Sequence, residues 1–399
     1  MRTPSSDLQS ERLAETDKLS ASANSRSALV SGIVRPDMRI LVAGDWHSDL
    51  HEEAIDQAFV TLGHESIRFS WHQYFRPMRR RERLLGPAYR FQNKYLVGPM
   101  VKRLNSDLVE LCRHVCPDML FVYRGSHIYG STLERIRAAS PGTILVGYNN
   151  DDPFSPAYPR WMWRHFLNAV PKYDLMLAYR PQNLDSFKAA GAKTTRLLRS
   201  WYIPQRNRPV ELGDEDRTRF ECDVVFAGHY EKDGRLQYLE EVVRRGWKLK
   251  LFGHDYGWHR ALAGSPILKS FMPLQTVWGE DYNKALCGAR VALCFLSKLN
   301  RDTYTRRCFE IPASGTLMLA EHTEDLASMF KPGVEADFYR SREEFVEKLE
   351  LYLTDGCLRQ RVAAAGRERV IFDGHDVVSR MRCVLQWVAE LSELRVTHV

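Results

Sequence analysis

The sequence predicts an α/β protein built from two doubly wound domains and finished by C-terminal helices. Two series of short apolar runs, bounded by glycine or polar residues, alternate with stretches of helical periodicity. A segment with two prolines, mixed charge and no periodicity separates the series, and we expect the linker there, at 202–221. No repeat of 20–50 residues is visible, which argues against a solenoid.

The composition is that of a soluble cytoplasmic protein. Hydrophobic residues make up 44% of the 399 residues and charged residues 27%, enough for a sizeable core. No apolar run approaches the roughly 20 residues that cross a bilayer. Residues 1–36 are polar and lack the apolar centre of a secretion signal, so we expect a disordered tail. The eight cysteines are scattered as core hydrophobes would be and give no strong metal signal.

The first domain is expected at 37–201. Its opening run, 38–44, ends in glycine as a buried first strand does, and a helix over 53–63 and a strand over 66–69 complete a βαβ unit. The same alternation then predicts a helix at 106–115 and four more strands, at 119–123, 143–148, 175–179 and 195–198.

A basic and aromatic insertion interrupts this domain at 72–105. Between Arg76 and Arg103, nine basic residues are opposed only by Glu82, so this segment carries +8 where the whole chain carries +7. Local basicity implies a local partner. For 74–103 a solvated insertion and docking on an anionic membrane or lipid-linked acceptor both stay open. Nucleic-acid binding is disfavoured, because no RNA- or DNA-binding module accompanies the segment.

The second domain is expected at 222–375, with a last helix at 376–399 that would return to the first domain. The strands are predicted at 222–228, 249–253, 291–296 and 336–339, and the main helices at 236–245, 282–286, 342–353 and 358–369.

The stretch 302–320 of this domain carries the densest chemistry. A helix start suits phosphate oxygens, arginine adds bidentate charge, and a carboxylate one turn later can accept both hydroxyls of a ribose. This combination predicts a nucleotide diphosphate site, and a solvated helix packed on the sheet is the alternative. A short helix before the turn at Gly315 is expected to hold Thr303, Thr305, Arg306, Arg307 and Glu310.

Two glycine turns support a phosphate site. In open parallel sheets, ligands bind beyond the carboxyl ends of the strands. Gly228 closes the first strand before His229, Gly253 closes the second before His254, and Arg235 begins the next helix with a further charge. An ordinary strand-to-helix turn is the alternative for each glycine. Neither GxGxxG nor GxxxxGK[ST] is present, which argues against the usual NAD and P-loop sites.

The segment from Val224 to about Arg382 resembles the glycosyl transferase-like domain of the spore maturation protein CgeB family, within the GT-B glycosyltransferases. The first half is similar to the degenerate N-terminal domain of such enzymes. The matching segments are VFAGHYEKDGR (225–235), KLFGHD (250–255), TYTRRCFEIPASGTLMLAE (303–321), the turn and strand 333–339, and RVAAAGRERV (361–370) with His375 and Arg380.

The resemblance implies a GT-B fold in which two Rossmann-like domains face a cleft and the second holds a nucleotide-sugar donor. The glutamate matched by Glu310 typically binds the ribose, and Arg306 or Arg307 would neutralise the diphosphate, with Arg235 as a second candidate. Asp302 lies where retaining enzymes often carry a second glutamate, and a helix cap is its alternative. Such enzymes generally use no bound metal, and the donor is a substrate, so no bound cofactor is expected.

The acceptor side would come from the first domain. Its first strand ends before His47, and a later strand ends before Asp151 and Asp152. An imidazole or carboxylate there could take the proton of an acceptor hydroxyl, as a general base does. A helix cap for Asp45 and an Asx-turn for the aspartate pair are the alternatives.

We therefore expect a metal-independent glycosyltransferase of polysaccharide biosynthesis, cytoplasmic or peripheral at the inner face of the membrane. Its acceptor would be a hydroxyl of a saccharide or glycolipid. A nucleotide-sugar epimerase of the same fold is one alternative. A non-catalytic nucleotide-sugar binding or assembly protein is the other, because the first domain shows no unambiguous base.

Overall fold

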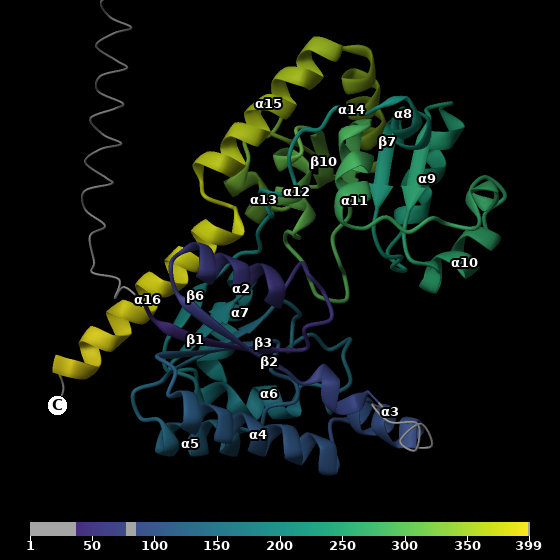
Figure 1. Cartoon of the computed structure of the whole chain (residues 1–399). Coiled ribbons are helices and arrows are strands. Elements are labelled where there is room, and N and C mark those ends of the chain that lie inside the picture. Colours follow the sequence, from purple (N-terminus) through teal and green to yellow (C-terminus); the bar gives the residue numbers. More distant parts are fainter. Residues whose placement is uncertain (1–36, 77–84, 398–399) are drawn as a thin grey trace, which may run out of the picture.

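The computed structural model describes residues 37–76 and 85–397, which form two parallel-sheet α/β domains (Figure 1). The tail expected at 1–36 and the arginines of the insertion at 79, 80, 81 and 83 lie outside the described residues. The predicted fold class is confirmed. The first sheet has the order β2-β1-β3-β4-β5-β6 and the second β11-β10-β9-β7-β8, and all neighbouring strands are parallel.

Helices cover both faces of the first sheet, which explains its almost continuous apolar strands. Alternate residues of one strand enter different cores: Ile40 and Val42 pack with α2, and Leu41 and Ala43 pack with α4. The strands are β1 (Arg39–Gly44), β2 (Glu65–Ser70), β3 (Met119–Tyr123), β4 (Ile144–Asn149), β5 (Leu175–Ala178) and β6 (Thr195–Leu197). The helices are α2 (Glu52–Thr61), α3 (Gly86–Tyr95), α4 (Pro99–Val115), α5 (Gly130–Ala139), α6 (Arg164–Ala169) and α7 (Pro181–Ala189), with short 3-10 turns η1 (His72–Phe75) and η3 (Val170–Lys172).

The second sheet is enclosed in the same way. One face packs on α9, α10, α14 and α15, and the other on α11 and α12. Its strands are β7 (Cys222–Ala227), β8 (Leu249–Phe252), β9 (Ala289–Cys294), β10 (Leu317–Glu321) and β11 (Asp337–Tyr339). The helices are α9 (Arg235–Arg244), α10 (Asp255–Ala263), α11 (Gly279–Cys287), α12 (Arg307–Ala313), α13 (Glu324–Met329), α14 (Arg342–Thr354) and α15 (Gly356–Phe372), with the 3-10 turn η4 (Lys269–Phe271).

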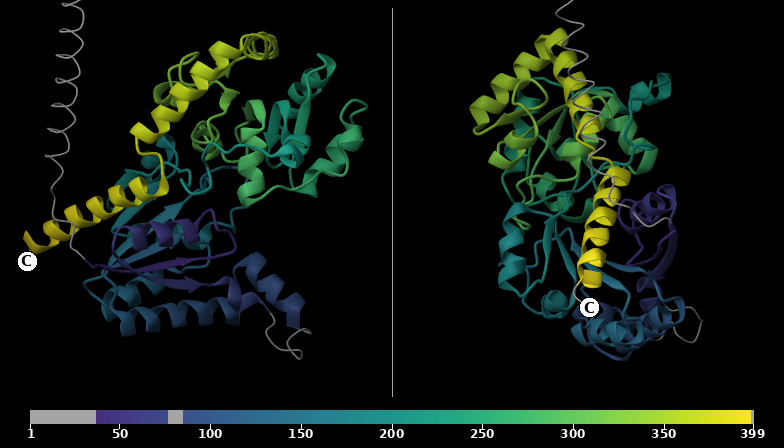
Figure 2. Two further views of the ribbon diagram at one scale, coloured as in Figure 1. Left: turned by 45° about the horizontal axis from the view of Figure 1, so that its top comes forward. Right: turned by 90° about the vertical axis from the view of Figure 1, so that its left-hand side faces the viewer.

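Two segments connect the domains. The stretch 202–221, expected to lack regular structure, contains α8 (Asp214–Phe220), whose first turn holds three acidic residues that suit the positive end of a helix. The last helix, α16 (Val377–Thr397), leaves the second domain and packs on α2 of the first (Figures 1 and 2). No helix in the described part of the chain is long and apolar enough to span a membrane.

The strand orders fix where ligands can bind. In the first sheet, successive strands are added on one side of β1 and then, from β3 on, on its other side. In the second sheet the same change of side occurs between β7 and β9. Loops diverge at the carboxyl ends of such strands and leave a crevice between them. A functional site is therefore expected beyond Gly44 and Tyr123 in the first domain and beyond Ala227 and Cys294 in the second.

Candidate functional site

A cavity lies beyond the carboxyl ends of β7 and β8. Leu50 of the first domain and Arg206 and Asn207 of the linker close one side of it. The predicted donor-binding residues that line this donor cavity are Gly228, His229, Gly253, His254, Arg306, Arg307 and Glu310. Thr305, Arg235 and Asp302 are not among its lining residues.

Two positions of this cavity, Gly228 and Gly253, are packed so closely that only glycine fits without displacing a neighbour. A β-carbon on Gly228 would lie 2.8 Å from Nη2 of Arg307, and one on Gly253 would lie 2.6 Å from the carbonyl oxygen of Gly228. A side chain at either position would therefore displace a wall of the cavity. The backbone at both turns can approach a ligand closely, as a phosphate site needs.

Arg307 lines the donor cavity, and its guanidinium has few partners among the described residues. Its guanidinium lies over the ring of Phe226, 5.8 Å from the centroid, and its Nε is buried without a hydrogen-bond partner. Within 37–76 and 85–397 no carboxylate forms an ion pair with it. Glu310 acts on this guanidinium only through space, and an anion in the cavity would add a direct charge-assisted contact.

Glu310 is held by two partners. It is 3% exposed, and its Oε1 forms an ion pair with Nε of Arg306 at 2.7 Å. Its Oε2 accepts a hydrogen bond from the hydroxyl of Tyr282 on α11 at 2.9 Å. Burial, together with the adjacent carboxylate, raises the pKa of Tyr282 well above its usual range, so this hydroxyl stays a donor. Carboxylate oxygens have further lone pairs, so ribose hydroxyls can still bind there. No sequence pattern singled out Tyr282.

Three donor-side expectations need correction. Arg235 is buried, pairs with Asp233 through Nε at 2.8 Å and donates to the carbonyl of His229, so it fixes the loop after β7 and does not reach the cavity. Thr303, Thr305 and Arg306 precede the helix that was expected to hold them, because α12 begins at Arg307. The Thr303 hydroxyl donates to Asp325 at 2.6 Å. It therefore fixes the loop before α12 and is not available to a phosphate.

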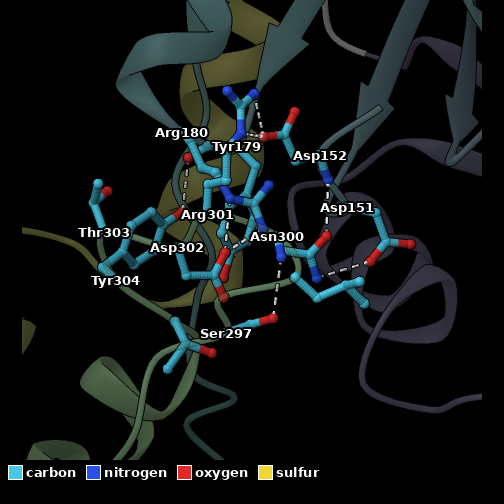
Figure 3. A network of polar contacts seen from close by, with 12 residues as sticks. Asp151, Asp152, Tyr179, Arg180, Ser297, Asn300, Arg301, Asp302, Thr303 and Tyr304 are labelled. Carbon is cyan, nitrogen blue, oxygen red and sulfur yellow. Dashed lines mark hydrogen bonds and ion pairs between the residues drawn. The ribbon is translucent and has the colours of Figure 1, made fainter. Parts of the chain in front are cut away.

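Asp302 and Asp152 belong to a polar interface between the domains (Figure 3). Asp302 pairs with Arg180 through Nε at 2.7 Å, and the two side chains are 7% and 1% exposed. Burial raises the pKa of Asp302 to about 6, although Arg180 opposes the shift. Asp302 therefore joins the domains and does not contact the donor cavity.

Asp152 cannot serve as the expected base. Its side chain is fully buried, and its Oδ2 pairs with both Nε and Nη2 of Arg301, at 2.7 and 2.6 Å. Its Oδ1 accepts from Asn183 at 3.0 Å. Asp152 is 0% exposed and does not line the donor cavity, so an acceptor hydroxyl cannot reach it there. The neighbouring Asp151 is half-buried and pairs with Arg124 at 2.7 Å.

His47 lies in the loop after β1, and its side chain is 54% exposed. Its Nδ1 is 3.0 Å from Oδ2 of Asp45, whose other oxygen lies 3.2 Å from Nδ1 of His72. The hydrogen bond that His47 donates to the Asp45 carboxylate raises the pKa of His47. Leu50, in the same loop, lines the donor cavity. Asp45 contacts two histidines, whereas a helix cap was the alternative role considered for it.

Metal-ligating side chains do not gather anywhere in the described ranges. No group of three or more His, Cys, Asp and Glu residues there is placed to hold a metal ion.

Comparison with known proteins identifies the fold. Residues 235–386 match the family model described as glycosyl transferase-like. No curated protein sequence matches the chain. Among solved structures, sucrose-phosphate synthase from Thermosynechococcus elongatus superposes with a TM-score of 0.63 at 11% identity, covering 88% of this chain and 99% of that chain.

Two further solved structures are similar to the chain in fold. Anabaena HepE in complex with UDP-glucose has a TM-score of 0.61 at 12% identity and covers 88% of this chain and 98% of that one. The α,α-trehalose 6-phosphate synthase from Burkholderia multivorans has a TM-score of 0.61 at 13% identity, over 92% of this chain and 100% of that one. The narrower CgeB resemblance stays a prediction. The chain has the GT-B glycosyltransferase fold, and its second domain matches a glycosyl transferase-like family.

Proposed function

We propose that the protein is a glycosyltransferase that moves a sugar from a nucleotide diphosphate donor to a hydroxyl of a saccharide or glycolipid. The observation that carries the proposal is the Arg307 guanidinium against Gly228, which has no ion-paired carboxylate among the described residues and lies in a cavity that also contains Glu310. The Arg307 cation and the close backbone at Gly228 suit a diphosphate, and the Glu310 carboxylate suits a ribose.

The donor cavity assigns a task to each of its groups. Arg307 binds the diphosphate and stabilises the charge that develops on it as the sugar departs, without a bound metal. Glu310 accepts from the ribose hydroxyls. Trp278, which lines the cavity and is 62% exposed, offers an apolar face to the base. HepE binds UDP-glucose, so UDP-sugars come first among the candidate donors.

His47 is our candidate base. Asp45 holds Nδ1–H, so Nε2 is free to accept the proton of the acceptor hydroxyl. That oxygen bonds to the anomeric carbon while the bond from this carbon to the diphosphate oxygen breaks, and the electron pair leaves with the diphosphate. Polysaccharide biosynthesis is the setting we infer for this reaction.

Donor binding is tested by calorimetric titration with UDP-, GDP-, dTDP- and CMP-sugars. We expect one of them to bind, and Arg307→Gln to weaken binding at least about tenfold, because a charge-assisted bidentate contact is lost. Arg260→Gln, an exposed arginine of α10, is the matched control. Absence of binding by all four classes would remove the proposal.

Turnover is tested separately with His47→Gln. We expect donor affinity to persist while transfer to saccharide acceptors is lost, and chelation of metals by EDTA to leave the unmutated enzyme active. Binding without any turnover in the unmutated protein supports the non-catalytic alternative. Conversion of the bound sugar without an acceptor supports the epimerase.

We further propose that the insertion docks on an anionic membrane surface from the cytoplasm. In its described part, exposed Arg90 and Lys94 on α3 accompany exposed Leu85, Phe91 and Val97, a pairing of basic and apolar side chains that suits a lipid interface. Liposome flotation is expected to show binding to anionic vesicles and much less to neutral ones. Flotation with neither kind would exclude the docking.

A further inference from the structure

A second cavity, of about 620 Å³, lies at the opposite edge of the second sheet from the donor cavity. The amino-terminal ends of β7, β9 and β10 form its floor, α15 one wall, and the linker segment 209–212 another. Its volume is in the range of small-molecule sites, which is roughly 300–1,000 Å³. Neither the fold nor the proposed transfer reaction uses it.

Positive charge dominates the lining of this arginine cavity. Arg217, Arg290, Arg359 and Arg367 face a single lining carboxylate, Glu221. Arg359 and Arg367 lie eight residues apart on α15, with Ala363 between them on the wall of the cavity. The cations therefore come from three elements, α8, β9 and α15, and converge on one space.

Three of these arginines lack an acidic partner in the described part of the chain. Arg290 pairs with Asp223 at 3.1 Å. Arg217 and Arg359 donate only to backbone carbonyls, of Leu212 at 3.0 Å and Tyr352 at 2.6 Å. The Nε of Arg367 is buried and has no hydrogen-bond partner.

The converging charges repel one another. Burial and the nearby Arg290 lower the pKa of Arg359, which shows that its charged form is disfavoured where it lies. The carboxyl-terminal ends of α11 and α12 also face the cavity, at Gly288 and Ser314. Each contributes only about half a negative charge, less than the surplus on the arginines.

We propose that the arginine cavity binds a small, multiply charged phosphate compound. All four cations are arginines, whose planar forks match phosphate oxygens in pairs, whereas lysine would act as a point charge. The apolar lining by Leu212, Leu317 and Ala363 gives room for an uncharged part of the same molecule. This site is distinct from the donor cavity, because the two cavities lie on opposite edges of the second sheet.

Inorganic pyrophosphate is the probe, titrated calorimetrically into the full chain carrying Arg307→Gln so that the donor cavity contributes least. We expect binding at one site, weakened at least about tenfold by adding Arg359→Gln and Arg367→Gln. Arg361→Gln, an exposed arginine of the same helix outside the cavity, should leave affinity unchanged. Circular dichroism checks the fold of each variant, and Arg217→Gln with Arg290→Gln repeats the test should the α15 pair misfold.

Equal pyrophosphate affinity with and without the cavity arginines would overturn the proposal, as would the absence of binding. Binding of a polyglutamate peptide in place of pyrophosphate would also overturn it, because the cavity would then be a peptide site. Donor binding is not needed for any of these outcomes. Failure here and failure of the proposed transferase activity are therefore separable.

Discussion

Arg307 illustrates, at the scale of one residue, how a binding group can reduce stability. Its Nε is buried without a hydrogen-bond partner, and no carboxylate of the described residues forms an ion pair with it, so Glu310 offsets its desolvation cost only through space. We expect Arg307→Gln to leave the free energy of unfolding unchanged or to raise it by up to about 1 kcal/mol, while donor affinity falls. Urea denaturation beside calorimetric titration measures both. A loss of more than about 1 kcal/mol in stability would show instead that Arg307 is structural.

Glu310 should behave in the opposite way. Its removal leaves Arg306 without its anion and Tyr282 without its acceptor. Arg306 is 24% exposed, so we expect Glu310→Ala to cost about 2 kcal/mol of unfolding free energy, below the range for fully buried pairs. Glu310→Gln retains an acceptor for Tyr282 and should cost less. Chemical denaturation compares the two variants, and equal costs would mean that the ion pair dominates.

The motif around 303–321 was sufficient to predict that Arg306, Arg307 and Glu310 lie together at a cavity, because these residues are neighbours in the sequence. It could not assign Asp152 or Asp302, whose partners Arg301 and Arg180 are more than 100 residues away in the chain. Tyr282 gave no signal either, since an aromatic residue on an amphipathic helix is usually a core residue.

At the scale of elements, the start of α16 contains an acid-sensitive contact. His375 stacks on Phe309, with ring centroids 4.3 Å apart, and its Nδ1 accepts from Arg380. Burial, then the charge of Arg380, lowers its pKa from 6.5 to about 3. Between these values the unfolded chain binds more protons, so the stability that neutral His375 supports is lost as pH falls below about 6.5.

His375→Gln keeps an acceptor for Arg380 but cannot titrate. We expect the dependence of unfolding free energy on pH, between pH 6 and 4.5, to become shallower by up to about 1.4 kcal/mol per pH unit. Urea denaturation across this range measures the slope. His114→Gln, at an exposed position, is the control, and an unchanged slope for His375→Gln would contradict the prediction.

Strands were the most predictable elements. Continuous apolar runs such as 119–123 can only be buried on both faces, and β3 occupies this run. Short helices were harder: α8 is charged throughout its first turns, and α13 has only 6 residues, so neither shows a clear apolar period. The loop 303–306 looked helical by composition, but tertiary contacts of Thr303 and Tyr304 keep these residues outside α12.

At the scale of the molecule, the polar interface fixes how the domains meet. Arg301→Ala leaves Oδ2 of a fully buried Asp152 without a partner. Arg301 is itself 44% exposed, so we expect a cost of about 2–3 kcal/mol in unfolding free energy. Donor affinity should fall as well, because this loop leads directly into Arg306 and Arg307.

Calorimetric unfolding and donor titration test this effect together. Arg160→Ala, an exposed arginine of the first domain, should change stability by less than about 0.5 kcal/mol. If Arg301→Ala and Arg160→Ala behaved alike, the interface would contribute nothing measurable to the association of the domains.

The crossing of α16 onto α2 has a consequence for synthesis on the ribosome. About 300 residues separate the end of α2 from the start of α16, so α2 is translated long before the helix that covers it. At usual elongation rates of roughly 5–20 residues per second, this face of the nascent first domain stays uncovered for about 15–60 s. We expect chaperones that bind apolar surface to contact α2 during that interval and to leave once α16 has emerged.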